Sequence, residues 1–110
     1  MVEEIITSLG LFFFASLLEI GGGYLVWKWL REHKGKIFGL IGALILFSYG
    51  IVPTFQPANF GRVYAAYGGI FIISSILWGY WVDKKKPDRF EIIGSSIVLI
   101  GVVVMFYFPR

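Results

Sequence analysis

Four long stretches of this 110-residue sequence carry almost no charged side chains. Residues 37–61, 63–82 and 92–109 contain no Asp, Glu, Lys or Arg, and residues 9–27 contain only Glu19. A helix needs about 20 apolar residues to cross the roughly 30 Å hydrocarbon core of a bilayer. The alternating polarity of barrel strands is missing, and backbone groups in lipid must pair internally. We therefore expect four transmembrane helices, at approximately residues 5–30, 37–56, 62–82 and 89–108.

The composition excludes a soluble globular domain and a disordered chain. Apolar residues make up 57% of the sequence and charged residues 15%, whereas about a quarter of a typical soluble domain is charged. The segments between the four stretches are too short to form a further domain. Residues 1–110 are thus expected to form one all-α integral membrane domain, with neighbouring helices running up and down in a four-helix bundle.

Lysine and arginine are concentrated on one side of this expected bundle. Eight of the ten lie at the end of the first helix or in the first and third loops: Lys28, Arg31, Lys34, Lys36, Lys84, Lys85, Lys86 and Arg89. The other two, Arg62 and Arg110, lie on the opposite side. Because positively charged loops stay in the cytoplasm, we expect both termini on the outer face of the membrane.

Glu19 is the most informative single residue, since it lies one position from the middle of the first stretch. An ionised carboxylate near the bilayer centre costs a few kcal/mol, and such residues are functional by default. Desolvation favours the protonated form, so a proton and a cation would compete for this group. The structural alternative is a protonated acid that hydrogen-bonds a neighbouring helix.

Two groups of residues are expected to surround Glu19. Small side chains three and four residues away allow another helix to approach closely: Ala15, Ser16, Gly22 and Gly23. An aromatic and polar stripe recurs at helical spacing in the third stretch: Tyr64, Tyr67, Phe71, Ser74 and Trp78. Aromatic faces hold cations, although ordinary aromatic packing or lipid contact explains the stripe equally well.

Other small residues are expected at helix contacts. Gly61, Ala65 and Gly69 repeat every four residues, a spacing typical of close helix packing in membranes. Gly94 and Gly101 are seven residues apart and hence share one face, which could pack against a second copy of the chain.

Arg62 is the only basic residue in the second loop, where Gln56 and Asn59 are polar neighbours. These three residues are candidates for a gate at the mouth of the bundle, with Arg62 as the partner of a carboxylate. The alternative for Arg62 is a side chain that extends to the lipid head groups.

The sequence predicts no enzyme, no metal site and no cofactor. It contains no cysteine and one histidine, His33, and no pair of carboxylates lies within one helix. The basic residues lie beside hydrophobic segments, so we expect the lipid bilayer rather than nucleic acid as the partner.

Residues 56–69, Gln-Pro-Ala-Asn-Phe-Gly-Arg-Val-Tyr-Ala-Ala-Tyr-Gly-Gly, resemble the signature of the YnfA family of small bacterial inner-membrane proteins. Residues 19–22, 78–83 and 87–89 agree with it, and the resemblance covers essentially the whole chain. That family is similar to the small multidrug resistance transporters, four-helix proteins that work as dimers and exchange protons for cationic compounds. The resemblance implies a bacterial inner-membrane location and a homodimer.

The similarity to those transporters also implies roles for single residues. Their first helix carries an embedded Glu followed three residues later by Gly, which Glu19 and Gly22 match. Their third-helix motif and the paired glycines of their fourth helix match at Gly61, Tyr64, Ala65, Gly69, Gly94 and Gly101. Tyr67 replaces the Trp of that motif, and Gly68 replaces its Ser. Arg62 is a further difference. Tyr67 and Arg62 together imply a substrate unlike bulky aromatic drugs.

We therefore expect a proton-coupled exporter of small or cationic compounds, in which Glu19 binds proton and substrate in turn and Tyr64 and Tyr67 line the site. The one-sided charge distribution predicts a single orientation, and hence a parallel dimer. The alternative is a non-transporting structural or accessory membrane protein in which Glu19 is a buried hydrogen-bonding acid.

Overall fold

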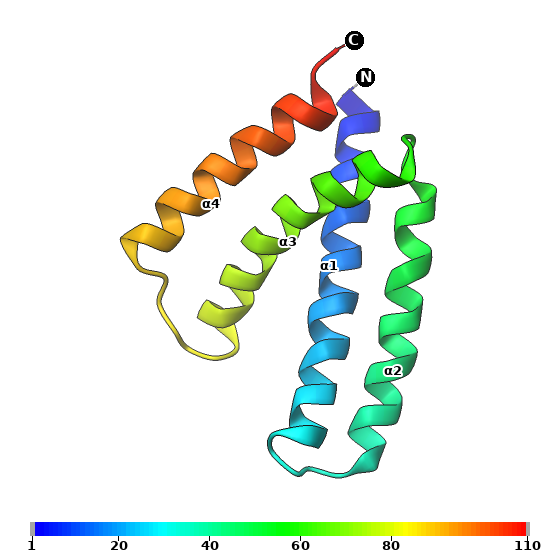
Figure 1. Ribbon diagram of the computed structural model, residues 1–110, viewed down its shortest axis with the longest axis vertical. Helices are drawn as coiled ribbons and strands as arrows, with labels where there is room; N and C mark the ends of the chain where they lie inside the picture. The colour runs from blue at the N-terminus through cyan, green and yellow to red at the C-terminus, as the bar shows by residue number, and fades with distance from the viewer. Residues whose placement is uncertain (1, 110) are drawn as a thin grey trace.

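The computed structural model describes residues 2–109, and that part of the chain contains helices and no strands (Figure 1). The four main helices are α1 (Val2–Leu30), α2 (Lys36–Ile51), α3 (Phe60–Trp81) and α4 (Arg89–Val102). A 3-10 helix, η1 (Val52–Phe55), continues α2, and a π-helix, η2 (Val103–Tyr107), continues α4. With these extensions all four are long and apolar enough to span a membrane, which confirms the expected four-helix membrane fold.

Neighbouring helices run in opposite directions, as predicted. Figure 1 shows the start of α1, the end of η2 and the 56–59 segment towards the top, which we call the terminal end. Residues 31–35 lie at the bottom and residues 82–88 lie further up at the left, and we call the end that carries these two loops the loop end. Helices α1 and α2 lie side by side along their length, α3 crosses α1, and α4 packs mainly on α3. The α3–α4 hairpin therefore diverges from the α1–α2 hairpin towards the loop end.

Two glycines allow α1 and α2 to pack closely. A Cβ atom added at Gly22 would lie 2.9 Å from the carbonyl oxygen of Gly42, and one added at Gly42 would lie 2.7 Å from that of Gly22. Of the small residues predicted around Glu19, Gly22 is therefore in contact with α2, whereas Ser16 contacts Ser74 of α3 and Gly23 is exposed. Gly42 is a partner that the sequence analysis did not identify.

Of the small residues Gly61, Ala65 and Gly69 on α3, only Gly69 lies in a helix contact within the chain. A Cβ atom at Gly69 would collide with Val102 of α4, so this glycine allows α3 and α4 to approach. Gly61 and Ala65, which lie nearer the start of α3, are exposed in this chain. Gly94 and Gly101 are also exposed, and an added Cβ at either would meet no atom within 4 Å.

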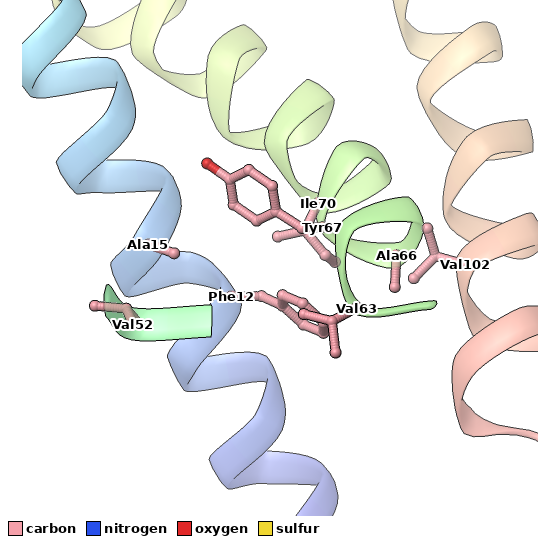
Figure 2. Close-up of a cluster of buried hydrophobic side chains, with 8 residues drawn as sticks. All are labelled: Phe12, Ala15, Val52, Val63, Ala66, Tyr67, Ile70 and Val102. Carbon is pink, nitrogen blue, oxygen red and sulfur yellow. The ribbon is translucent and has the colours of Figure 1, made fainter. Parts of the chain in front are cut away.

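The hydrophobic core lies near the terminal end, where α1, η1, α3 and α4 converge (Figure 2). Its buried members are Phe12, Ala15, Val52, Val63, Ala66, Tyr67, Ile70 and Val102. A buried polar network adjoins it. The Ser8 hydroxyl donates to Gln56 Oε1 at 2.7 Å and lies 3.0 Å from the Tyr107 hydroxyl, and Gln56 Nε2 donates to the Ser8 carbonyl at 2.9 Å. The two hairpins are therefore joined firmly at the terminal end.

Candidate functional site

Glu19 and Tyr67 meet between α1 and α3. The Tyr67 hydroxyl donates a hydrogen bond of 2.6 Å to Glu19 Oε1, and Figure 2 shows the Tyr67 side chain reaching from α3 towards α1. Tyr67 is 4% exposed and its ring packs against Phe12, Tyr49 and Phe71, at centroid distances of 6.4, 5.4 and 5.8 Å. These rings hold the hydroxyl in place towards the carboxylate. Tyr67, one of the two tyrosines expected to line the Glu19 site, thus bonds directly to the carboxyl group.

Two further tyrosines lie near this pair. Tyr49 of α2 packs its ring against that of Tyr67 at a centroid distance of 5.4 Å and lies near Glu19, and Tyr64 of α3 lies near both of these tyrosines. Glu19 thus faces hydroxyl groups from α2 and α3. Tyr49 was not predicted from the sequence. The signal that could have identified it is a tyrosine rather than a phenylalanine within a charge-free stretch, because its hydroxyl needs a partner in lipid.

A cleft of about 850 Å³ extends from Glu19 towards the loop end, between α1 and α3. Four aromatic side chains line it, Tyr24, Trp27, Phe71 and Trp78, and Ser75 lies among them. Glu32, Asp83 and Lys85 lie at its mouth. Glu19 is the carboxyl group at the inner end of this cleft. A carboxyl group, hydroxyl groups and aromatic faces together can accept either a proton or a cation.

The predicted stripe of α3 does face α1. The Ser16 hydroxyl donates to Ser74 Oγ at 2.8 Å, and the rings of Tyr24 and Trp78 meet edge to face at 5.4 Å. Trp78 Nε1 is buried and has no hydrogen-bond partner among the described residues. The stripe therefore forms one wall of the cleft and part of the contact between the hairpins.

The three residues proposed for a gate lie at the terminal end, away from the mouth of this cleft. Gln56 is buried in the network with Ser8, and the Asn59 side chain caps α3 by accepting a hydrogen bond of 2.9 Å from the backbone N–H of Arg62. Within residues 2–109, Arg62 has no ion pair with a carboxylate. Gln56 and Asn59 thus have structural partners in the chain itself.

Comparison with known proteins identifies relatives over nearly the whole chain. The family described as "Uncharacterised BCR, YnfA/UPF0060 family" matches residues 5–110. The "UPF0060 membrane protein" of Clostridium beijerinckii is 58% identical over 109 residues, which cover 97% of this chain and 98% of the relative. The "UPF0060 membrane protein YfjF" of Bacillus subtilis is 60% identical over 101 residues, which cover 91% and 93% of the two chains. No solved structure matches the chain.

Proposed function

Because the chain belongs to the YnfA/UPF0060 family of membrane proteins, we propose that it is a small transporter that exports small or cationic compounds in exchange for protons. The observation that carries this proposal is the hydrogen bond between Tyr67 and Glu19 at the inner end of an aromatic cleft. A lone ionisable group within lipid needs a reason to be there. A site for a proton or a cation provides that reason.

Competition between a proton and the substrate for a single carboxyl group would couple the inward movement of protons to the export of the substrate. A protonated Glu19 is neutral and remains in the apolar interior at little cost, whereas the ionised form needs a counter-charge. A cation between the carboxylate and the nearby rings would supply that charge. The tyrosine hydroxyl donates to either form of the carboxyl group, so it keeps the group in one position throughout the exchange.

The direction of transport follows from the position of the cleft mouth. The cleft reaches the loop end, which carries eight of the ten lysines and arginines. In the proposed orientation this end faces the cytoplasm and both termini face outward across the bacterial inner membrane. The cleft would then be open to the side from which an exporter takes its substrate.

We further propose that the working unit is a parallel homodimer. The charge distribution favours one orientation for every copy. The exposed glycines Gly94 and Gly101 leave a face of α4 on which a second helix could approach closely.

One observation favours a second function, a non-transporting membrane protein. Tyr67 is part of the hydrophobic core, and its hydroxyl already gives Glu19 a partner. On this hypothesis the pair is a structural link between α1 and α3, and replacing Glu19 would lower the stability without removing a binding activity.

Binding measurements separate the two functions. Purified protein in detergent is titrated with quaternary ammonium and guanidinium compounds between about pH 6 and pH 9, and the release of protons is recorded in weakly buffered solution. An exporter binds more tightly as the pH rises, releases protons on binding, and loses both properties in Glu19→Gln.

The matched control is Glu32→Gln, which removes a carboxylate from the mouth of the same cleft and leaves Glu19 in place. It should retain the proton release. The transporter proposal fails if no compound releases protons from the wild type, or if Glu32→Gln abolishes the release as completely as Glu19→Gln does.

A further inference from the structure

The cleft has the depth of a single lipid leaflet. Glu19 and Leu30 are 11 residues apart on α1, and a rise of 1.5 Å per residue separates them by about 16 Å. Half of the hydrocarbon core of a bilayer measures about 15 Å. Glu32, Asp83 and Lys85, which follow the ends of α1 and α3, therefore lie at the level of the lipid head groups.

Only two of the four main helices, α1 and α3, line the cleft. The lining residues come from α1, α3 and the segments that follow them, whereas α2 packs against α1 and α4 packs against α3. The aromatic walls suit a hydrocarbon chain. Gly23 and Gly79 line the cleft without a side chain that would narrow it. The space beside them is open, since a Cβ atom added at either position would meet no atom within 4 Å.

The mouth carries charges of both signs. The Glu32 carboxylate is 3.5 Å from Lys28 Nζ, and it therefore has a partner on its own helix. Within residues 2–109, neither Asp83 nor Lys85 has an ion pair. The turn that carries them is well defined, because Lys84 has a φ of 60° and the Lys85 N–H bonds to the Gly79 carbonyl at 2.9 Å. One carboxylate and one ammonium group are thus held two residues apart at head-group level.

We propose that the cleft binds an aminophospholipid, a lipid whose head group combines a phosphate with a primary amine. Its phosphate pairs with Lys85, its ammonium group with Asp83, and one acyl chain lies between α1 and α3 with its end near Glu19. A primary ammonium group donates three hydrogen bonds to carboxylates, whereas a choline group donates none and a glycerol group carries no charge. The lipid would occupy the same cleft as the proposed substrate, but its head-group contacts at Asp83 and Lys85 do not involve Glu19, and its binding is measured without any transport substrate.

Native mass spectrometry of the protein in detergent tests the proposal. Phosphatidylethanolamine, phosphatidylcholine and phosphatidylglycerol with identical chains are added separately, and the fraction of protein that retains one lipid is compared. The wild type should bind phosphatidylethanolamine roughly fivefold more tightly than the other two, the factor that one well-formed ion pair near the surface supplies. Equal binding of the three lipids would overturn the proposal.

Two charge variants and one control assign the head-group contacts. Asp83→Asn should reduce the binding of phosphatidylethanolamine to that of phosphatidylcholine, and Lys85→Gln should weaken all three lipids. Lys86→Gln removes the same charge one residue further along the loop, at a residue outside the lining of the cleft, and should change nothing. If Lys86→Gln acts like Lys85→Gln, the loop attracts lipid only by its net charge and the proposed contact is wrong.

A second pair of variants tests the position of the acyl chain. Gly23→Leu fills the cleft, whereas Gly21→Leu adds the same side chain to α1 at a position that does not line it. Only Gly23→Leu should abolish lipid retention, while the helical circular dichroism signal of both variants stays unchanged. If Gly23→Leu instead dissociates a dimer and leaves lipid retention intact, a second copy rather than a lipid covers the cleft.

Discussion

The Tyr67 hydroxyl lies 2.6 Å from Glu19 Oε1, and this contact joins α3 to the middle of α1 at the inner end of the cleft. Tyr67 belongs to the hydrophobic core that joins the two hairpins, and Glu19 lines the cleft. A change of charge on Glu19 would therefore act directly on the contact between the hairpins.

Replacing Tyr67 by phenylalanine keeps the ring in the core and removes only the hydrogen bond to Glu19. We expect a loss of about 1–3 kcal/mol of stability, because a half-buried acceptor loses its donor, and weaker cation binding. Thermal unfolding in detergent followed by circular dichroism measures the first effect. Tyr80→Phe on the same helix is the control, since Tyr80 is 48% exposed. An unchanged stability in Tyr67→Phe would mean that the bond contributes little to the fold.

Replacing Gly42 by alanine should push α1 and α2 apart. Its Cβ atom would lie 2.7 Å from the carbonyl oxygen of Gly22, and forcing atoms into a packed contact costs about 1–3 kcal/mol. Gly50→Ala on the same helix meets no atom within 4 Å, and it should stabilise the helix by up to about 1 kcal/mol. Urea or heat unfolding of the two variants should thus shift in opposite directions, and shifts of the same sign would contradict this account of the contact.

Ser8→Ala should loosen the terminal end. It removes the hydroxyl that donates to Gln56 and contacts Tyr107, and leaving buried polar atoms without partners costs about 1–3 kcal/mol. Hydrogen exchange should increase in the first turns of α1 and in η1, with little change near the loop end. Ser96→Ala, whose hydroxyl bonds only to the carbonyl of its own helix in the described chain, is the control. A uniform increase in exchange would indicate global destabilisation instead.

His33→Gly should stabilise the protein. His33 has a φ of 55°, and α1 ends with a bond of 3.0 Å from the Lys34 N–H to the Lys28 carbonyl. A side chain in this left-handed conformation costs about 1–2 kcal/mol that glycine avoids. Lys34→Gly, at a position where φ is not positive, should give no such gain. A lower unfolding temperature in His33→Gly would show that the histidine side chain makes a contribution of its own.

The proposed orientation can be measured directly, because the sequence contains no cysteine. Single cysteines replace Ala58 at the terminal end and Lys86 at the loop end, and intact cells are treated with a membrane-impermeant maleimide. Ala58→Cys should react in intact cells and Lys86→Cys only after lysis, as the distribution of positive charge requires. The reverse pattern would place the cleft mouth outside the cytoplasm and contradict export through it.

The number, type and order of the helices could be predicted because each depends on local properties. A charge-free stretch of sufficient length must form a helix in lipid wherever its neighbours lie. The same reasoning identified Glu19, since an acid in such a stretch stands out without any knowledge of packing. Tyr64 and Tyr67 were proposed from their helical spacing and from the resemblance to the small multidrug resistance transporters, and the structure adds that Tyr67 is the residue that donates to Glu19.

The contacts between helices could not be predicted in the same way. A helix in lipid is apolar on all sides, so its sequence has little amphipathic pattern to show which face meets a neighbour. This explains why Tyr49 and Gly42 on α2 were missed, and why the burial of Gln56 against Ser8 was not foreseen.

The sequence by itself determined that this is a membrane protein of four helices with one acid in its interior, because hydrophobicity and charge act residue by residue. Only the tertiary structure decided that the hairpins are joined at the terminal end, that Tyr67 meets Glu19, and that a cleft extends from this pair to the loop end. Those features depend on how the helices rotate and cross. Close packing between particular side chains, such as Gly22 on Gly42 and Gly69 on Val102, determines that geometry.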